Sequence, residues 1–196
     1  NTSGNATYLG GAGIDTFVST ANTMTISDLA VGNVADIITN AAAGTVAATT
    51  TGNFTATAAT SNAAANSAFT IAADAAEVVN LAGVTGGNGY SVTSTGTGAI
   101  TGSLAVDILT NTSGTAVYLG GAGNDAFTNS ADTMTLNDLS GSDSVINAAG
   151  ATVNATTTAN FLATAVTRNA AANTAFTIAA NAAESVNLAA VNGGNG

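Results

Sequence analysis

Two nine-residue stretches combine glycines and an aspartate in a spacing that suits the binding of a hard cation. Residues 10–18 read GGAGIDTFV and residues 120–128 read GGAGNDAFT, so both follow the pattern G-G-x-G-x-D-x-U-x, in which U is a large apolar residue. Glycine permits the positive φ of a tight turn, where carbonyl oxygens can converge, and the aspartate adds a carboxylate. Because Ca²⁺ prefers about six to eight oxygen ligands, the spacing predicts calcium-binding turns.

The stacking expected of such nonapeptides selects the candidate ligands. Two nonapeptides make one solenoid turn, so residues 18 apart are expected to lie one above the other. Residues 102–110 and 111–119 also fit the period, which makes Asp107 and Asp125 the best-defined pair. Asp15 should lack a stacked partner, since the position one turn before it precedes residue 1. The candidate metal-site residues are Asp107, Asp125, Asp15, Gly121, Gly123, Gly11 and Gly13, followed by Asp36 and Asp143, which have the D-x-U spacing without a glycine pair.

An aspartate in a glycine-rich turn also has a purely structural explanation. Its carboxylate can accept hydrogen bonds from nearby backbone N–H groups and hold the turn without a metal. The complete nonapeptides favour calcium at Asp15 and Asp125, and neutralising a stacked pair is then expected to be a condition of folding. The two explanations have equal weight for Asp28, Asp138, Asp36 and Asp143.

The elements that carry these turns are repeated in tandem. Residues 1–29 match residues 111–139 at 19 of 29 positions, and residues 49–89 match residues 156–196 at 32 of 41. Repeats that stack bury faces that none of them could bury alone. The chain is therefore expected to be all-β, a parallel β-solenoid of the β-helix or β-roll type built from tandem units of about 110 residues.

The unit boundaries and the local elements follow from the same comparison. The first unit is expected to span residues 1–110 and a second, truncated unit residues 111–196, which makes the chain part of a longer array. Alternation at residues 90–95 predicts a strand rather than a linker across the join. The β-type clusters at residues 69–71 and 78–81 predict further strands. Short helical turns are expected near residues 63–65 and 170–172.

The composition removes several classes of function. The chain has no His or Cys, which excludes imidazole and thiol chemistry, and its only glutamates, Glu77 and Glu184, have no neighbouring acid for glycoside hydrolysis. We therefore expect no enzymatic activity. A net charge of −10, with Arg168 as the single basic residue, argues against nucleic acid as a partner. The chain contains no run of about 20 strongly apolar residues, so no transmembrane segment is expected.

The complete nonapeptides resemble those of the repeats-in-toxin (RTX) proteins, whose glycine-rich repeats form calcium-filled parallel β-rolls. The surrounding Ala/Thr/Asn/Gly composition, with AEVVNL at residues 76–81 and AESVNL at residues 183–188, is similar to bacterial surface-layer proteins that embed such rolls in a longer solenoid. The resemblance implies a secreted, extracellular protein of the cell surface that binds Ca²⁺. It also implies self-association into a lattice or filament, with a cell-surface polysaccharide as a candidate anchor.

Two functional hypotheses remain open at this point. The first is a structural segment of a calcium-stabilised bacterial surface layer or extracellular fibre. The alternative is the repeat or stalk region of a large secreted calcium-dependent adhesin that binds a glycan or another surface. The chain has no Trp and three Tyr, so aromatic platforms for sugar rings are scarce, which favours the first hypothesis.

Overall fold

Short strands with alternating buried and exposed side chains build the whole chain. In β14 (Ala126–Asn129) the burial alternates, so that Phe127 lies in the core while its neighbours face outward. Leu109 and Tyr118 occupy the same position of the preceding nonapeptides and are also fully buried. The apolar residue of each nonapeptide therefore faces the core, as the sequence predicted.

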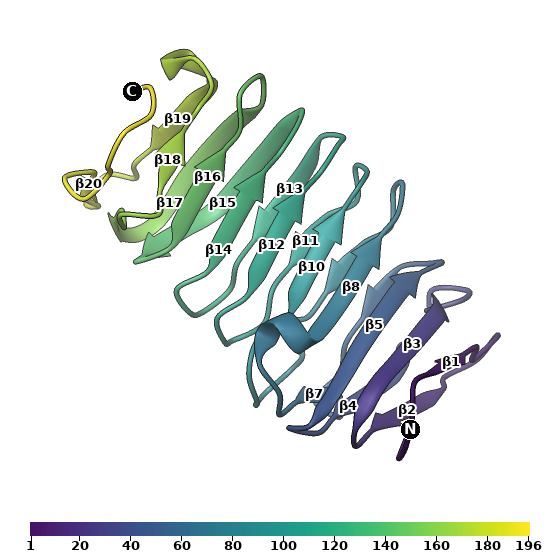
Figure 1. Cartoon of the computed structure of the whole chain (residues 1–196). Coiled ribbons are helices and arrows are strands. Elements are labelled where there is room, and N and C mark those ends of the chain that lie inside the picture. Colours follow the sequence, from purple (N-terminus) through teal and green to yellow (C-terminus); the bar gives the residue numbers. More distant parts are fainter.

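The strands stack in parallel into a solenoid of about nine turns, described over all 196 residues by the computed structural model (Figure 1). This confirms the predicted all-β parallel β-solenoid. One side is a nine-stranded sheet formed, in spatial order, by β1 (Ala6–Tyr8), β3 (Asn22–Leu29), β5 (Gly44–Thr50), β8 (Phe69–Ala73), β10 (Ser91–Ser94), β12 (Ile108–Asn111), β14, β16 (Ser144–Asn147) and β18 (Arg168–Asn169).

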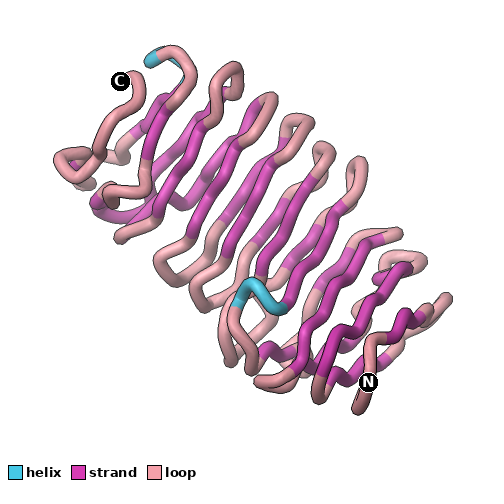
Figure 2. The backbone as a smooth tube through the Cα atoms, in the orientation of Figure 1, coloured by secondary structure: helices cyan, strands magenta, loops and turns pink.

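Two further sheets form the rest of the wall. An eight-stranded sheet contains β19 (Phe176–Ala179), β17 (Thr152–Leu162), β15 (Thr133–Gly141), β13 (Ala116–Leu119), β11 (Ile100–Thr101), β9 (Val79–Asn80) and β6 (Phe54–Thr55), with β20 (Val186–Asn187) also paired with β17. A three-stranded sheet contains β2 (Thr16–Ser19), β4 (Ile37–Asn40) and β7 (Ser61–Asn62). The backbone path in Figure 2 shows the loops gathered at the corners between these sheets.

The length of a turn changes along the chain. In the glycine-rich part, Leu109 pairs with Phe127, which is the predicted spacing of two nonapeptides. In the second part of each sequence unit the turns are longer than two nonapeptides, since Phe54 pairs with Val79 and Phe161 pairs with Val186. The additional residues lie in the corners, where the 3₁₀ turns η1 (Asn66–Ala68) and η2 (Asn173–Ala175) occur. These helical turns begin directly after the predicted segments. Neither has the length and hydrophobicity needed to cross a membrane.

Equivalent strands of the two sequence copies lie on opposite sides of the solenoid. In the first copy Ala6, Met24, Val46 and Phe69 stack in the nine-stranded sheet. Their equivalents stack in the same order in the eight-stranded sheet, namely Ala116, Met134, Val153 and Phe176. The counterpart of β1 in the second copy is β13, which lies between β12 and β14 in sequence. Along the nine-stranded sheet β12 is the fifth strand after β1 and β14 is the sixth, so one unit spans five and a half turns.

Replacing Tyr90 by Phe is expected to stabilise the fold. The Tyr90 side chain is fully buried and its ring meets Phe69 edge-on at 4.8 Å, but its hydroxyl has no hydrogen-bond partner. A buried polar group without a partner costs about 1–3 kcal/mol, so Tyr90→Phe should raise the free energy of unfolding by about 1 kcal/mol. Denaturant titration checks this. Tyr118→Phe is the control that should lose stability, because the Tyr118 hydroxyl donates to Asn111.

Candidate functional site

Three aspartates form a column along the corner that precedes the nine-stranded sheet. Asp107, Asp125 and Asp143, here called the aspartate ladder, are at most 2% exposed. The backbone N–H of Asp107 donates to Asp125 Oδ1 at 2.7 Å, and the N–H of Asp125 donates to Asp143 Oδ1 at 2.7 Å. The predicted stacking of Asp107 on Asp125 is therefore confirmed, and Asp143 extends the column by one turn.

The two outer ladder carboxylates each close a corner by accepting from two segments of backbone. Asp107 accepts from the N–H of Tyr90 one turn before and from the N–H of Ser103 within its own turn, both at 2.6 Å. Asp143 accepts from the N–H of Asp125 one turn before and, within its own turn, from the N–H of Ser140 at 2.9 Å. A corner interrupts the sheet hydrogen bonding, and the aspartate supplies the acceptors that the strands do not. The structural role left open by the sequence is thus present in the structure.

The glycines of the nonapeptide have separate roles. Gly121 and Gly123 have φ of +92° and +136°, and Gly11 and Gly13 have φ of +81° and +112°, so all four adopt the left-handed conformation that glycine favours. The first glycine of the nonapeptide is needed for a different reason, which is the space it leaves. A Cβ added to Gly120 would lie 2.3 Å from Asp125 Oδ2, so only glycine leaves room for the ladder carboxylate.

Asp28 and Asp138 bind the glycine pair from the following turn. Asp138 Oδ1 and Oδ2 accept the N–H groups of Gly120 and Gly121, both at 2.9 Å. Asp28 makes the same two contacts in the first copy, again at 2.9 Å, with Gly10 and Gly11. These aspartates were only weak candidates in the sequence. The signal that would have selected them is their position, two nonapeptides after the first glycine in both copies.

The first copy holds an incomplete version of the ladder. Asp36 accepts from the N–H of Asp15 at 2.9 Å and from the N–H of Ala30 at 2.8 Å, as its equivalent Asp143 does in the second copy. The carboxylate of Asp15 itself accepts no hydrogen bond, and its Oδ2 is buried without a partner. This agrees with the expectation that Asp15 has no residue stacked before it.

Burial makes the ladder an unfavourable place for negative charge. Desolvation raises the pKa of Asp125 to about 8, with smaller contributions from the charges of Asp107, Asp143 and Asp138. The pKa of Asp143 rises to about 6 and that of Asp107 also rises, in both cases mainly through burial. Hydrogen bonds from the backbone offset part of this effect in each case. The column therefore favours either a proton or a cation beside Asp125.

The donor set suits Ca²⁺ in chemistry but only partly in arrangement. Carboxylate and carbonyl oxygens are the ligands that calcium prefers. The carbonyl oxygen of Ser103 faces Gly121, so that a Cβ there would lie 2.1 Å from it, and the carbonyl of Ala105 faces Gly123. No three acidic side chains converge closely enough to hold a metal by themselves. An ion at this edge would therefore depend mainly on carbonyl oxygens, because both oxygens of Asp138 and Oδ1 of Asp125 already accept backbone N–H groups.

A column of buried asparagines on the same sheet was missed by the sequence reasoning. Asn111, Asn129, Asn147 and Asn169, here called the asparagine ladder, donate in turn from Nδ2 to the Oδ1 of the next, at 2.9, 3.2 and 3.0 Å. Each also donates to carbonyls of the corner, as Asn129 Nδ2 does to Thr152 O at 2.7 Å. The signal was present, because an asparagine ends each strand at a spacing of one turn.

The two glutamates have local structural contacts. Glu77 accepts from the hydroxyl of Thr50 one turn before and from the N–H of Asp74 at 3.1 Å. Glu184 makes the equivalent contact with the hydroxyl of Thr157. The equivalent positions thus hold the same corner in both copies.

No known protein family, curated protein or solved structure matches this chain.

Replacing Gly121 by Ala is expected to destabilise the fold by about 3 kcal/mol or more, since a left-handed non-glycine residue costs about 1–2 kcal/mol and the added Cβ would overlap Ser103 O. Gly11→Ala is the matched control. Gly11 has a similar φ of +81° but open space around it, so only the backbone cost should appear. Thermal and denaturant unfolding measure both. Equal losses for the two variants would show that the contact with Ser103 is unimportant.

Proposed function

We propose that this chain is a segment of a structural rod in a bacterial surface layer or extracellular fibre. The observation that carries the proposal is the apolar row that continues across the join between the two sequence copies. Ile71, Val92, Leu109, Phe127 and Val145 are paired in register from one turn to the next. Each additional sequence unit therefore lengthens the solenoid along its axis, because no linker separates the units.

The dimensions of the rod follow from its turns. Strands in a sheet lie about 4.8 Å apart, so a unit of five and a half turns adds about 26 Å to the axis. Successive units present equivalent surfaces on opposite sides. A two-unit period of about 53 Å then restores the same face, which suits an assembly that makes lateral contacts on both of its sides.

Electron microscopy and fibre diffraction of the native material test this role. We expect an ordered lattice or fibre, with a diffraction spacing near about 4.8 Å along the rod. Isolated flexible strands tipped by a separate domain would instead support the adhesin stalk. The secreted and cell-surface location is part of the same proposal, and labelling of intact cells with an antibody against this chain would establish or reject it.

Calcium is proposed as a local reinforcement of the glycine-rich edge, where it would neutralise Asp125 and Asp138. Removing it with EDTA is expected to lower the melting temperature at pH 8, because the buried ladder would then hold uncompensated charge. Differential scanning calorimetry with and without chelator measures this effect. If EDTA leaves the melting temperature and circular dichroism unchanged, and titration calorimetry detects no Ca²⁺ binding, the calcium role is wrong; the proposal of a structural rod does not depend on this result.

A further inference from the structure

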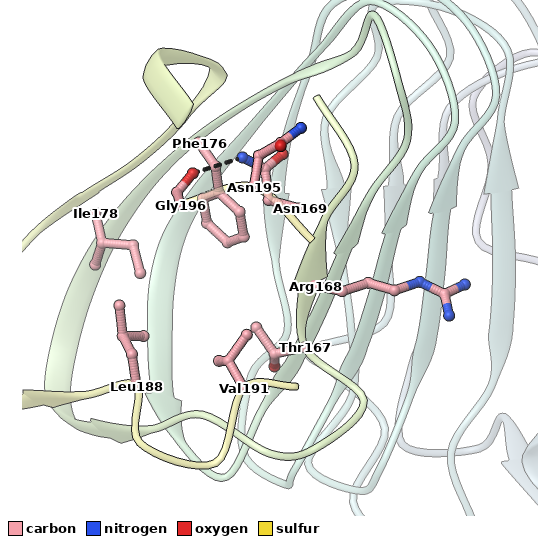
Figure 3. A pocket seen from close by; sticks show the side chains of 9 residues that line it. All are labelled: Thr167, Arg168, Asn169, Phe176, Ile178, Leu188, Val191, Asn195 and Gly196. Carbon is pink, nitrogen blue, oxygen red and sulfur yellow. Dashed lines mark hydrogen bonds between the residues drawn. The ribbon is translucent and has the colours of Figure 1, made fainter. Parts of the chain in front are cut away.

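The C-terminal end of the solenoid presents an apolar face. Phe176, Ile178, Leu188 and Val191 surround an open pocket, and Figure 3 shows the side chain of Arg168 directed away from them. Leu188 is 49% exposed, and the other three are partly buried. An apolar end of this kind is a candidate contact surface for another segment of protein.

The first sequence copy contains the same face in a covered state. The equivalent residues, 107 positions earlier, are Phe69, Ile71, Leu81 and Val84, and each is at most 2% exposed. They are covered by the segment that has no repeated counterpart in the chain, residues 90–110, here called the joining turn. The joining turn therefore shows what kind of segment covers this face.

The joining turn makes one aromatic contact, one apolar contact and a set of strand pairings. The Tyr90 ring packs edge-on against Phe69 at 4.8 Å between centroids, and Val92 lies opposite Ile71 in the sheet. On the other wall, β11 pairs with β9, and Thr101 O accepts from the N–H of Leu81 at 2.9 Å. Phe69, Ile71 and Leu81 on the receiving face have identical counterparts in the second copy, whereas Asp74, which accepts from the Thr95 hydroxyl, is replaced there by Asn181.

The backbone approaches the two faces in the same way. In the first copy Asn62 Nδ2 donates to Gly89 O at 2.7 Å, immediately before the joining turn begins. In the second copy Asn169 Nδ2 donates to Gly196 O at 2.9 Å, the bond drawn as a dashed line in Figure 3. The exposed face is therefore already arranged to receive a following turn.

The opposite side of the joining turn matches the N-terminal end. Its Asp107 N–H donates to Asp125, and the equivalent acceptor in the first copy is Asp15, whose carboxylate accepts nothing and has a buried Oδ2 without a partner. Its Gly102 N–H donates to Leu119 O at 2.8 Å, and the equivalent Leu9 is 73% exposed. The apolar face at the C-terminal end and the unpaired Asp15 carboxylate at the N-terminal end thus correspond to the two sides of the joining turn.

We propose that residues 90–110 are the joining element of the array and that the C-terminal face is a docking site for a second joining turn. The occupant is an extended segment that places an aromatic ring on Phe176 and a β-branched side chain opposite Ile178. Residues 1–29 match residues 111–139, which follow the joining turn, so the segment seen to cover this face is the joining turn itself. The inference rests on the proposed rod for its setting, but its test does not.

An extended chain tests the docking directly. Residues 90–110 are appended after Gly196, and amide hydrogen exchange is followed in β19 and β20. We expect exchange of the Phe176–Ala179 amides to slow by about tenfold or more and the melting temperature to rise, since these edges gain strand partners. An appended segment with Ala in place of its leading Tyr should lose most of the gain, and a scrambled segment all of it.

The Phe176→Ala variant provides the matched control. It should reduce the gain in the extended chain strongly and cost the unextended chain less, because Phe176 packs against the core there but is only partly buried. Unchanged exchange in β19, or equal protection by the scrambled segment, overturns the proposal. So does a dimer of the unextended chain in which β19 is already protected, because a second copy is then the occupant. Neither result depends on microscopy of the native assembly, so failure of docking and failure of the rod are distinguishable.

Discussion

At pH 8 in the presence of EDTA, the Asp125→Asn variant is expected to be more stable than the parent chain. Burial raises the pKa of Asp125 to about 8 from an ordinary value of 3.8, so the folded chain binds a proton that the unfolded chain releases. The contribution of Asp125 to stability is therefore fully present below about pH 4 and is lost as the pH rises from about 4 to about 8. One pKa unit corresponds to about 1.4 kcal/mol, so the total change amounts to several kcal/mol.

Asparagine keeps the acceptor and removes the charge. Its Oδ1 can still receive the N–H of Asp107, which Asp125 Oδ1 accepts at 2.7 Å. The unfolding free energy of Asp125→Asn should consequently vary less with pH than that of the parent chain, although Asp143, with a pKa of about 6, and Asp107 continue to contribute. Denaturant titrations at intervals between pH 4 and pH 8 measure the two curves. Parallel curves would show that ionisation of Asp125 does not lower the free energy of unfolding.

The sign of the same substitution distinguishes a proton from a cation. If Ca²⁺ neutralises the ladder, Asp125→Asn should be stabilising in EDTA and destabilising in millimolar calcium, because the variant has lost a ligand. If the ladder has only the structural role seen in its hydrogen bonds, calcium should leave the difference between variant and parent chain unchanged. One variant in two buffers thus separates the two explanations that the sequence left open.

The fold was predictable because its signal is periodic. The position of Phe127 and Leu109 in the nonapeptide determines which side chains face the core, and a spacing of two nonapeptides places Asp107 on Asp125. The partners of those carboxylates were not predictable in the same way. The N–H of Tyr90 reaches Asp107 across a turn that is one residue shorter than two nonapeptides, and turn length is set by corner geometry that the nonapeptide does not encode.

The half-turn offset between the copies was hidden for a related reason. A sequence comparison aligns Met24 with Met134 but contains no information on which wall each one occupies. The answer depends on the sum of all turn lengths between them, including the unrepeated residues 90–110. The joining turn therefore has a second consequence. Its length is one of the turn lengths that together place the next unit on the opposite wall.

Completing the asparagine ladder in the first copy is expected to stabilise the chain. Ser19 stands where the second copy has Asn129, and the Ser19 hydroxyl and Asn40 Oδ1 are both buried without partners. In Ser19→Asn the new Nδ2 can donate to Asn40 Oδ1, as Asn129 donates to Asn147. Gly44 leaves space beside both side chains. Satisfying one buried acceptor should add about 1–2 kcal/mol to the free energy of unfolding.

The reverse substitution, Asn129→Ser, is expected to have the larger effect. It removes an amide that accepts from Asn111 and donates to Asn147 and Thr152, and it leaves the buried Oδ1 of Asn147 without its partner. The loss should reach about 3 kcal/mol or more, because each unsatisfied buried group costs about 1–3 kcal/mol. Urea titrations of both variants measure the pair. A destabilised Ser19→Asn would show that the two walls hold the ladder in different geometries, so that the half-turn offset alters the core as well as the surface.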